Sequence, residues 1–259
     1  MNNEKQLTII EHIDELRKRL MVIVVFFAMA VVGAFFIAKP LIKYIQYSEE
    51  AKSLTLNAFN VTDPIMIFIK VIVIVAIVLI SPVISYHLWA FISPGLHETE
   101  RRVTLSYIPF GFILFLTGVA FSYFILFPYI MKFMMNLSNE LDITQTIGIN
   151  EYFNFLFQIT LPFGVIFQMP IVILFLTRLG IIEPGHLVKF RKYAFFILFV
   201  TAAIITPPDL FSHLFVTLPL FLLYEMSIVI SRFGYRKYLK AEQQRKIEEL
   251  ESQTAIKND

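Results

Sequence analysis

Residues 64–92, PIMIFIKVIVIVAIVLISPVISYHLWAFI, decide the fold class, because this long apolar run contains a single Lys, Arg, Asp or Glu, namely Lys70. A helix needs about 20 apolar residues to cross the hydrocarbon core of a bilayer. Further apolar runs recur along the chain, at 21–38, 104–131, 152–177, 193–206 and 210–231. Together they predict an all-α polytopic membrane protein with six transmembrane helices.

The overall composition agrees with this class. Hydrophobic residues make up 57% of the chain and charged residues 16%, against about 25% charged residues in soluble domains. Cysteine is absent, which excludes disulfides, thiol catalysis and thiolate metal sites. No long polar linker separates the apolar runs, so we expect a single six-span membrane domain over residues 1–233, followed by a polar cytoplasmic tail over 234–259.

The lysines and arginines predict the orientation, because cytoplasmic segments of membrane proteins are enriched in them. Basic residues gather at 17–19, 101–102, 189–192 and 232–246. The segments expected outside hold only Lys39, Lys43, Lys52 and Lys132. This bias predicts that both termini face the cytoplasm.

The ends of the membrane domain have features of their own. Ile9, Ile13, Leu16 and Leu20 form an apolar stripe, which predicts a separate amphipathic helix over about 8–20, lying along the cytoplasmic surface. Prolines within the spans predict a kinked, cupped bundle. Helices 5 and 6 are predicted to be short; helix 5, over 193–206, would cover only about 21 Å, a mismatch that local thinning of the bilayer would relieve.

The polar residues suggest binding and not catalysis. Two charged segments, 11–20 and 93–102, lie on the cytoplasmic side, although pairs such as Glu15 with Arg19 also occur on ordinary solvated helices. Gln168 and Glu225 lie at membrane depth, where polar groups usually face the protein interior or a wet cavity. The five histidines are scattered and no nucleophile–base pattern is visible. We therefore expect no enzyme, no metal site and no cofactor.

Ordered motifs along the chain resemble the TatC family, the multispanning subunit of twin-arginine protein translocases. The resemblance covers about residues 8–233, and its motifs lie at His12–Leu20, Trp89–Arg102, Tyr123–Pro128, Phe163–Pro170, Thr206–Ser212 and Leu223–Glu225. It implies export of folded proteins bearing a twin-arginine signal peptide across the cytoplasmic membrane of a prokaryote, powered by the proton-motive force.

The resemblance also implies the site residues. Glu15 and Glu100 would bind the arginine pair of the signal peptide, since a guanidinium pairs with a carboxylate bidentately and lysine cannot copy that geometry. Their neighbours Arg17, Arg19, Arg101 and Arg102 would either position these carboxylates or compete with the ligand. The residues implied for a partner-helix or cavity surface are Gln168, Pro94, Tyr123, Phe163, Asp209 and Glu225.

The chain departs from the family pattern at Gln168, where many members carry glutamate. Glutamine can hydrogen-bond but cannot ionise, so we expect Gln168 to be a polar docking point and not a proton relay. The implied partners are single-span TatA-type and TatB-type subunits, or one bifunctional TatA, together with further copies of this chain; nucleic acid is not implied. An alternative from another class is a small secondary transporter with Gln168 and Glu225 in a solute or ion pathway.

Overall fold

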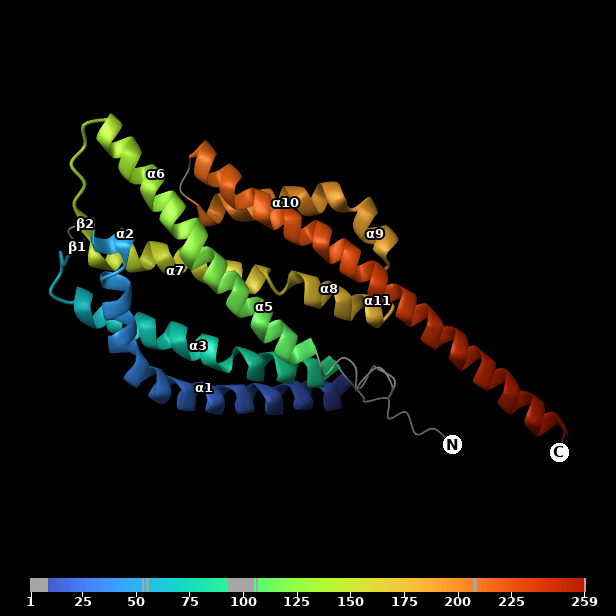
Figure 1. Cartoon of the computed structure of the whole chain (residues 1–259). Helices are drawn as coiled ribbons and strands as arrows, with labels where there is room; N and C mark the ends of the chain where they lie inside the picture. Colours follow the sequence, from blue (N-terminus) through green and yellow to red (C-terminus); the bar gives the residue numbers. More distant parts are fainter. Residues whose placement is uncertain are drawn as a thin grey trace.

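The computed structural model describes residues 9–52, 54, 56–92, 105, 107–206 and 209–258, and these residues form an elongated helical bundle (Figure 1). In chain order the elements are α1 (Ile9–Gln46), α2 (Glu49–Lys52), β1 (Leu56–Asn57), α3 (Asp63–Ile92), α5 (Tyr107–Phe121), the π-helix η2 (Ser122–Leu126), α6 (Phe127–Glu140), β2 (Ile147–Gly148), α7 (Ile149–Ile166), α8 (Met169–Arg178), α9 (Pro184–Lys189), α10 (Arg191–Ile205) and α11 (Leu210–Asn258).

The helices have the lengths of membrane spans. Among the described residues, five helical stretches are long and apolar enough to cross a membrane: Ile13–Gln46, Asp63–Phe91, Tyr107–Glu140, Ile149–Arg178 and Leu210–Gln244. α10 corresponds to the predicted fifth span but has 15 residues, which cover about 22 Å. The all-α polytopic membrane fold is therefore confirmed, while the count of six spans and their orientation stay predictions.

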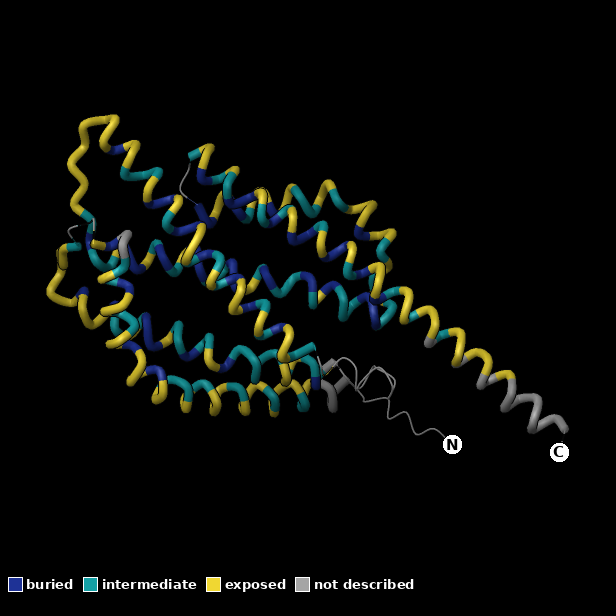
Figure 2. Tube along the Cα trace, in the orientation of Figure 1, coloured by how far each residue is buried: buried dark blue, intermediate teal, exposed yellow. Residues whose placement is uncertain are grey.

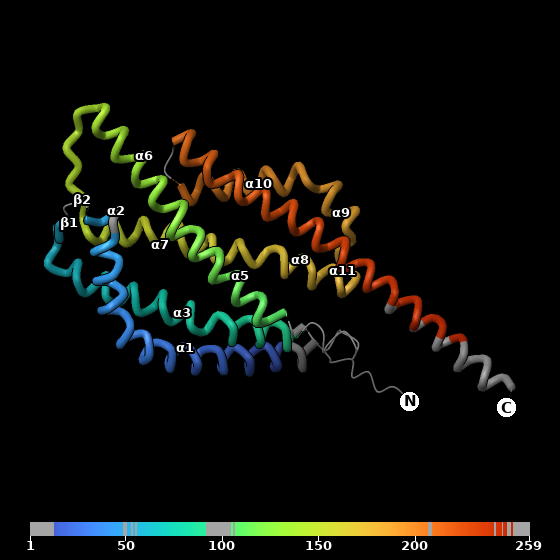
Figure 3. Tube along the Cα trace, viewed as in Figure 1, coloured from blue at the N-terminus to red at the C-terminus, as the bar shows by residue number. Residues whose placement is uncertain are grey.

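Two predicted boundaries differ from the structure. The sequence predicts a separate surface helix at 8–20, but residues 9–20 form the first turns of α1, which continues unbroken to Gln46. No Gly or Pro lies between Ile9 and Gly33, so nothing interrupts the helix. Helix 6, predicted to be short at 210–231, is the first half of α11, which has 49 residues (Figure 3). The Lys, Glu and Gln residues of the tail are good helix formers, and they extend the helix past the bundle.

The connections that were predicted as external loops are partly structured. α1 and α6 extend into the predicted loops 39–62 and 132–150, up to Gln46 and Glu140. The remaining parts of the two connections are joined by the short parallel pairing of β1 with β2, in which Leu56 lies opposite Ile147 and Asn57 opposite Gly148. This pairing ties the connection after α1 to the beginning of α7.

α7 contributes many residues to the buried core, and α5 packs closely against it. Phe153, Phe163 and Ile159 of α7 are fully buried, whereas the outward face of α1 is exposed along most of its length (Figure 2). α5 and α7 approach closely at Gly118. A Cβ at this position would lie 2.7 Å from Phe167 Cγ and 2.8 Å from the Phe163 carbonyl oxygen. Small residues are a common device for helix packing in lipid, where no hydrophobic force draws helices together.

Prolines account for the irregular turns. Pro170 has no amide hydrogen for the Ile166 carbonyl, and here the fourth span breaks into α7 and α8. In the third span, the π-helix η2 ends just before Phe127-Pro128. π-Helical turns and prolines are recognised causes of bends within long helices. The bundle is thus kinked, as the sequence predicts.

Gly118→Ala is expected to destabilise the protein by about 1–3 kcal/mol, the usual cost of overpacking, because the new methyl group would press on the backbone of α7. The matched control is Gly33→Ala, where a Cβ would meet nothing within 4 Å. Thermal unfolding in detergent should show a lower midpoint for Gly118→Ala and no loss for Gly33→Ala. Equal midpoints would contradict the close α5–α7 contact.

Candidate functional site

Glu15 lies near the start of α1 and is held by Arg19 one helical turn away. Arg19 Nε donates to Glu15 Oε1 at 3.0 Å, and Arg19 Nη2 bonds the same oxygen. The two side chains are only 25% and 23% exposed. Within the described part of the chain, Glu15 Oε2 makes no hydrogen bond. Arg19 therefore holds the carboxylate in one orientation through Oε1 and leaves Oε2 unbonded.

The neighbours of Glu15 differ in exposure and pairing. Asp14 pairs with Lys18 at 2.8 Å, and both side chains are well exposed. Arg17 is exposed on another face of α1 and makes no ion pair with any residue that the structure describes. Of the residues predicted to bind the signal peptide, Glu100, Arg101 and Arg102 lie outside the described residues, as does Pro94 of the cavity set. The predicted pairing of Glu15 with Glu100 thus stays a prediction.

Gln168 occupies the break between α7 and α8. Its side-chain Nε2 donates to the carbonyl oxygen of Gly111 on α5 at 2.8 Å. A Cβ at Gly111 would lie 3.2 Å from Gln168 Oε1, so the glycine permits this close approach. Gln168 is half-buried and already stabilises the α5–α8 contact through one hydrogen bond. Any docking role must therefore use the Gln168 side-chain oxygen or the second hydrogen of its Nε2.

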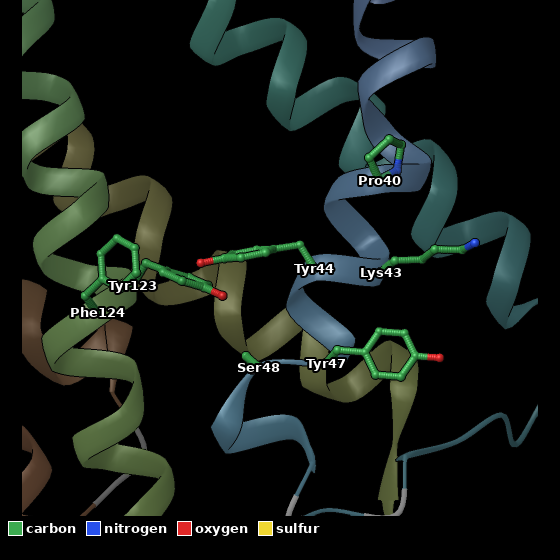
Figure 4. Close-up of a pocket in the computed structure, with 7 residues that line it drawn as sticks. All are labelled: Pro40, Lys43, Tyr44, Tyr47, Ser48, Tyr123 and Phe124. Atoms are coloured by element: carbon green, nitrogen blue, oxygen red, sulfur yellow. The ribbon is translucent and has the colours of Figure 1, made fainter.

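Tyr123 and Phe163, predicted for the same surface, lie in different surroundings. Tyr123 lies on η2 and lines a cleft of about 570 Å³ opposite the last turns of α1, where Tyr44 reaches toward it (Figure 4). Phe163 is fully buried and packs against Phe121 and Phe167, with ring centroids 6.3 and 6.4 Å away. Tyr123 is thus accessible to a partner, whereas Phe163 is part of the core.

Asp209 and Glu225 belong to the α10–α11 hairpin. Asp209 Oδ1 accepts a hydrogen bond from the Ser212 amide at 2.7 Å, so this carboxylate caps α11. Glu225 Oε2 pairs with Arg191 Nη2 of α10 at 2.8 Å. Arg191 was not predictable as this partner from the sequence, because the two residues lie 34 positions apart. Both carboxylates therefore have internal structural roles.

Lys70 is the functional candidate that the sequence analysis did not develop. Its ammonium on α3 donates to Asn150 Oδ1 at 2.8 Å and to Asn154 Oδ1 at 2.7 Å, both on α7. The two asparagines are one helical turn apart, which puts both amides on one face of α7. In the described part of the chain, no carboxylate lies within 4 Å of this cation. The amide oxygens solvate a positive charge that would otherwise be costly at membrane depth.

The arrangement of the described residues offers recognition groups. Among the described residues, no group of three or more His, Asp or Glu side chains is placed to hold a metal ion. At one end of the bundle, by contrast, an oriented carboxylate lies on α1 at Glu15, and the ion pair Arg191–Glu225 links α10 to α11. Such groups can bind a cationic peptide and hold helices in register.

Comparison with known proteins identifies relatives of the chain. A sequence model of the family described as Sec-independent protein translocase protein (TatC) matches residues 11–219. The chain is 57% identical to the Sec-independent protein translocase protein TatCy of Bacillus subtilis, covering 91% of this chain and 93% of that one. It is 54% identical to the TatC protein of Halalkalibacterium halodurans, covering 95% and 97% of the two chains.

A similar fold is also present among solved structures. The crystal structure of the twin-arginine translocase receptor TatC superposes with a TM-score of 0.76 at 34% sequence identity, covering 86% of this chain and 99% of that one. A second crystal structure of the same receptor, in the detergent DDM, gives a TM-score of 0.77 at 35% identity, with 85% and 99% coverage.

Replacing both Asn150 and Asn154 by leucine should lower the free energy of unfolding by about 1.5–3 kcal/mol, the usual worth of hydrogen bonds to a charged group. The double variant leaves the Lys70 ammonium without its two acceptors. Adding Lys70→Met removes the charge and should recover part of the loss. Asn136→Leu, at an exposed position on α6, is the control. Chemical or thermal unfolding in nanodiscs would measure the effect, and a triple variant no more stable than the double would contradict it.

Proposed function

The chain belongs to the TatC family of Sec-independent protein translocases, and from this premise we propose that it is the receptor for twin-arginine signal peptides and the core scaffold of its translocase. The observation that carries the proposal is the oriented carboxylate of Glu15, within a chain that matches the family over most of its length. In this role the protein selects cargo by its signal peptide and moves it in the folded state, drawing on the proton-motive force.

The protein is a multi-pass membrane protein, and its proposed location is the cytoplasmic membrane of a prokaryote, with six spans and both termini in the cytoplasm. The basic residues support this orientation. So does the path of the chain, since α1 begins and α11 ends toward the same end of the bundle (Figure 3). α10 would be the fifth span, short as it is.

Recognition of the arginine pair would depend on Glu15 acting with Glu100 of the first cytoplasmic loop. One guanidinium of the ligand would bind Glu15 first through Oε2, the oxygen that Arg19 does not bond, and would reach both oxygens by displacing Arg19 from Oε1. A guanidinium presents two parallel donors to a carboxylate, whereas a lysine ammonium acts as a point charge. Two carboxylates on one surface would therefore prefer Arg-Arg over Lys-Lys.

The geometry supports a positioning role for Arg19 over a purely competing one. Both Arg19 donors bond Oε1 and hold the Glu15 side chain in place. Arg19 lies on the same helix as Glu15, one turn away, so the pair can open without separating any helices. A signal-peptide arginine can therefore join the carboxylate or displace Arg19.

The partners we propose are single-span TatA-type and TatB-type subunits, or one bifunctional TatA, docking along the later spans near Gln168. The Tyr123 cleft is a further accessible surface on the bundle. The protein is a translocase component by family, and we propose that it performs no enzymatic turnover. A secondary transporter of small solutes has no comparable support, because the family match extends over residues 11–219.

Glu15→Gln should weaken binding of an Arg-Arg signal peptide about ten- to hundredfold, since a charge-assisted hydrogen bond is worth about 1.5–3 kcal/mol and 1.4 kcal/mol corresponds to tenfold in affinity. A Lys-Lys peptide should bind the unmodified protein weakly. Fluorescence anisotropy with the full-length protein in nanodiscs would measure both affinities.

The matched control is Asp14→Asn, which removes the adjacent carboxylate, exposed and paired with Lys18. It should leave the affinity for the Arg-Arg peptide unchanged. Equal losses of affinity in the two variants would mean that binding depends on the overall negative charge and not on Glu15 in particular. Unchanged binding in Glu15→Gln would remove Glu15 from the receptor site.

Replacement of Gln168 separates docking from internal support. Gln168→Glu loses the donor to the Gly111 carbonyl but keeps a polar side chain, whereas Gln168→Leu loses both. If Gln168 is a docking point, export of a reporter protein should fall severalfold in Gln168→Leu and stay near normal in Gln168→Glu. Gln158→Leu is the control, because Gln158 makes only long contacts of 3.4 and 3.5 Å to α10 carbonyls. If both Gln168 variants lost export equally, the role of Gln168 would be its hydrogen bond to α5 and not docking.

A further inference from the structure

α11 carries one face whose chemistry changes where the helix leaves the bundle. Leu222, Met226, Val229 and Phe233 are all well exposed, with Phe233 62% accessible. They recur at intervals of four, three and four residues, so they lie along one stripe of the helix. Arg236 and Lys237 continue the stripe past Phe233, with Lys240 one turn farther. The face is thus apolar up to Phe233 and basic beyond it.

A small pocket lies beside this transition. It has a volume of about 270 Å³ and is formed between α11 and the start of α9, lined by Arg232, Tyr235, Arg236, Glu183, Pro184 and Gly185. Arg232 and Arg236 are one helical turn apart, so both guanidinium groups reach the same opening. In the part of the chain that the structure describes, neither arginine has a carboxylate within 4 Å.

The charge of the pocket favours an anion. Two guanidinium groups face one carboxylate, Glu183, and the Tyr235 side chain also lines the pocket. The positions lie in the middle of α11, which ends at Asn258, so the negative end of the helix dipole is far away. Planar guanidinium groups bind phosphate oxygens bidentately.

We infer that this pocket binds the phosphate of an anionic glycerophospholipid, with the acyl chains lying along the exposed stripe from Phe233 to Leu222. Basic pockets and basic clusters just beyond an apolar span are suited to anionic headgroups. An apolar face that leads directly to two arginines matches a molecule with acyl chains at one end and a phosphate at the other. The site does not depend on the receptor function; only its assignment to the cytoplasmic leaflet rests on the proposed orientation.

The test is lipid retention by the delipidated full-length protein in detergent, measured by native mass spectrometry with added phosphatidylglycerol or diacylglycerol. The unmodified protein should retain phosphatidylglycerol about tenfold more than diacylglycerol. Arg232→Gln/Arg236→Gln should reduce phosphatidylglycerol to the diacylglycerol level. Arg232→Lys/Arg236→Lys, which keeps the charge but loses the bidentate geometry, should be intermediate.

Lys189→Gln/Lys192→Gln is the matched control, because it removes the same charge from exposed positions at the same end of the bundle, outside the pocket. This control should retain phosphatidylglycerol within twofold of the unmodified protein. An equal loss in the control would overturn the site in favour of general charge. Protection by inorganic phosphate alone, equal to that by phosphatidylglycerol in thermal unfolding, would overturn the lipid as the source. If Arg232→Gln/Arg236→Gln left lipid retention unchanged but lost a co-purifying protein, the lipid site would be overturned in favour of a protein interface.

Discussion

A polypeptide in hydrocarbon must satisfy its own backbone hydrogen bonds, because no water is present to replace a missing partner. Most of the irregular features of this bundle follow from that constraint. Pro170 removes one donor, and at this point the helix divides into α7 and α8. Gln168, at the break, donates to the Gly111 carbonyl of α5. η2 precedes Pro128 in the third span, and it presents Tyr123 to the cleft facing α1.

The low dielectric of the membrane places a similar constraint on charges. Lys70 is solvated by two amides of another helix, and Arg191 of α10 is paired with Glu225 of α11. These contacts join different helices, so breaking them weakens helix packing and also leaves a charged group without its partner. Glu15 differs, since its partner Arg19 lies on the same helix, one turn away. Its partner can be exchanged without separating any helices, which is the property that a carboxylate needs in order to bind an incoming arginine.

The apolar runs and the prolines made the spans and the kinks predictable, because both act locally. The continuous α1 was not predicted, since the amphipathic stripe at 8–20 and the apolar run after it have different surfaces, although no Gly or Pro separates them. Phe163 and Tyr123 are both aromatic residues within apolar runs, so the sequence does not separate them. Phe163 lies in the core and Tyr123 lines a cleft, a difference that depends on packing between helices. The partners of Glu225 and Lys70 lie far away along the chain, and no periodicity connects them.

On the proposed six-span topology, the unequal lengths of α10 and α11 locate the hydrophobic mismatch. α10 ends at Ile205 and α11 begins at Leu210, and the ion pair Arg191–Glu225 puts the first residue of α10 level with Glu225. Arg232, the first basic residue of α11, lies seven positions farther along, or about 10 Å. The shortfall of α10 thus lies at its Arg191 end and not at the hairpin. α9 adjoins this end, where the Tyr224 hydroxyl donates to the Leu187 carbonyl at 2.9 Å. A local thinning of the bilayer beside α10 would therefore occur in the leaflet that meets α9, because mismatch deforms the lipid where the apolar surface is missing.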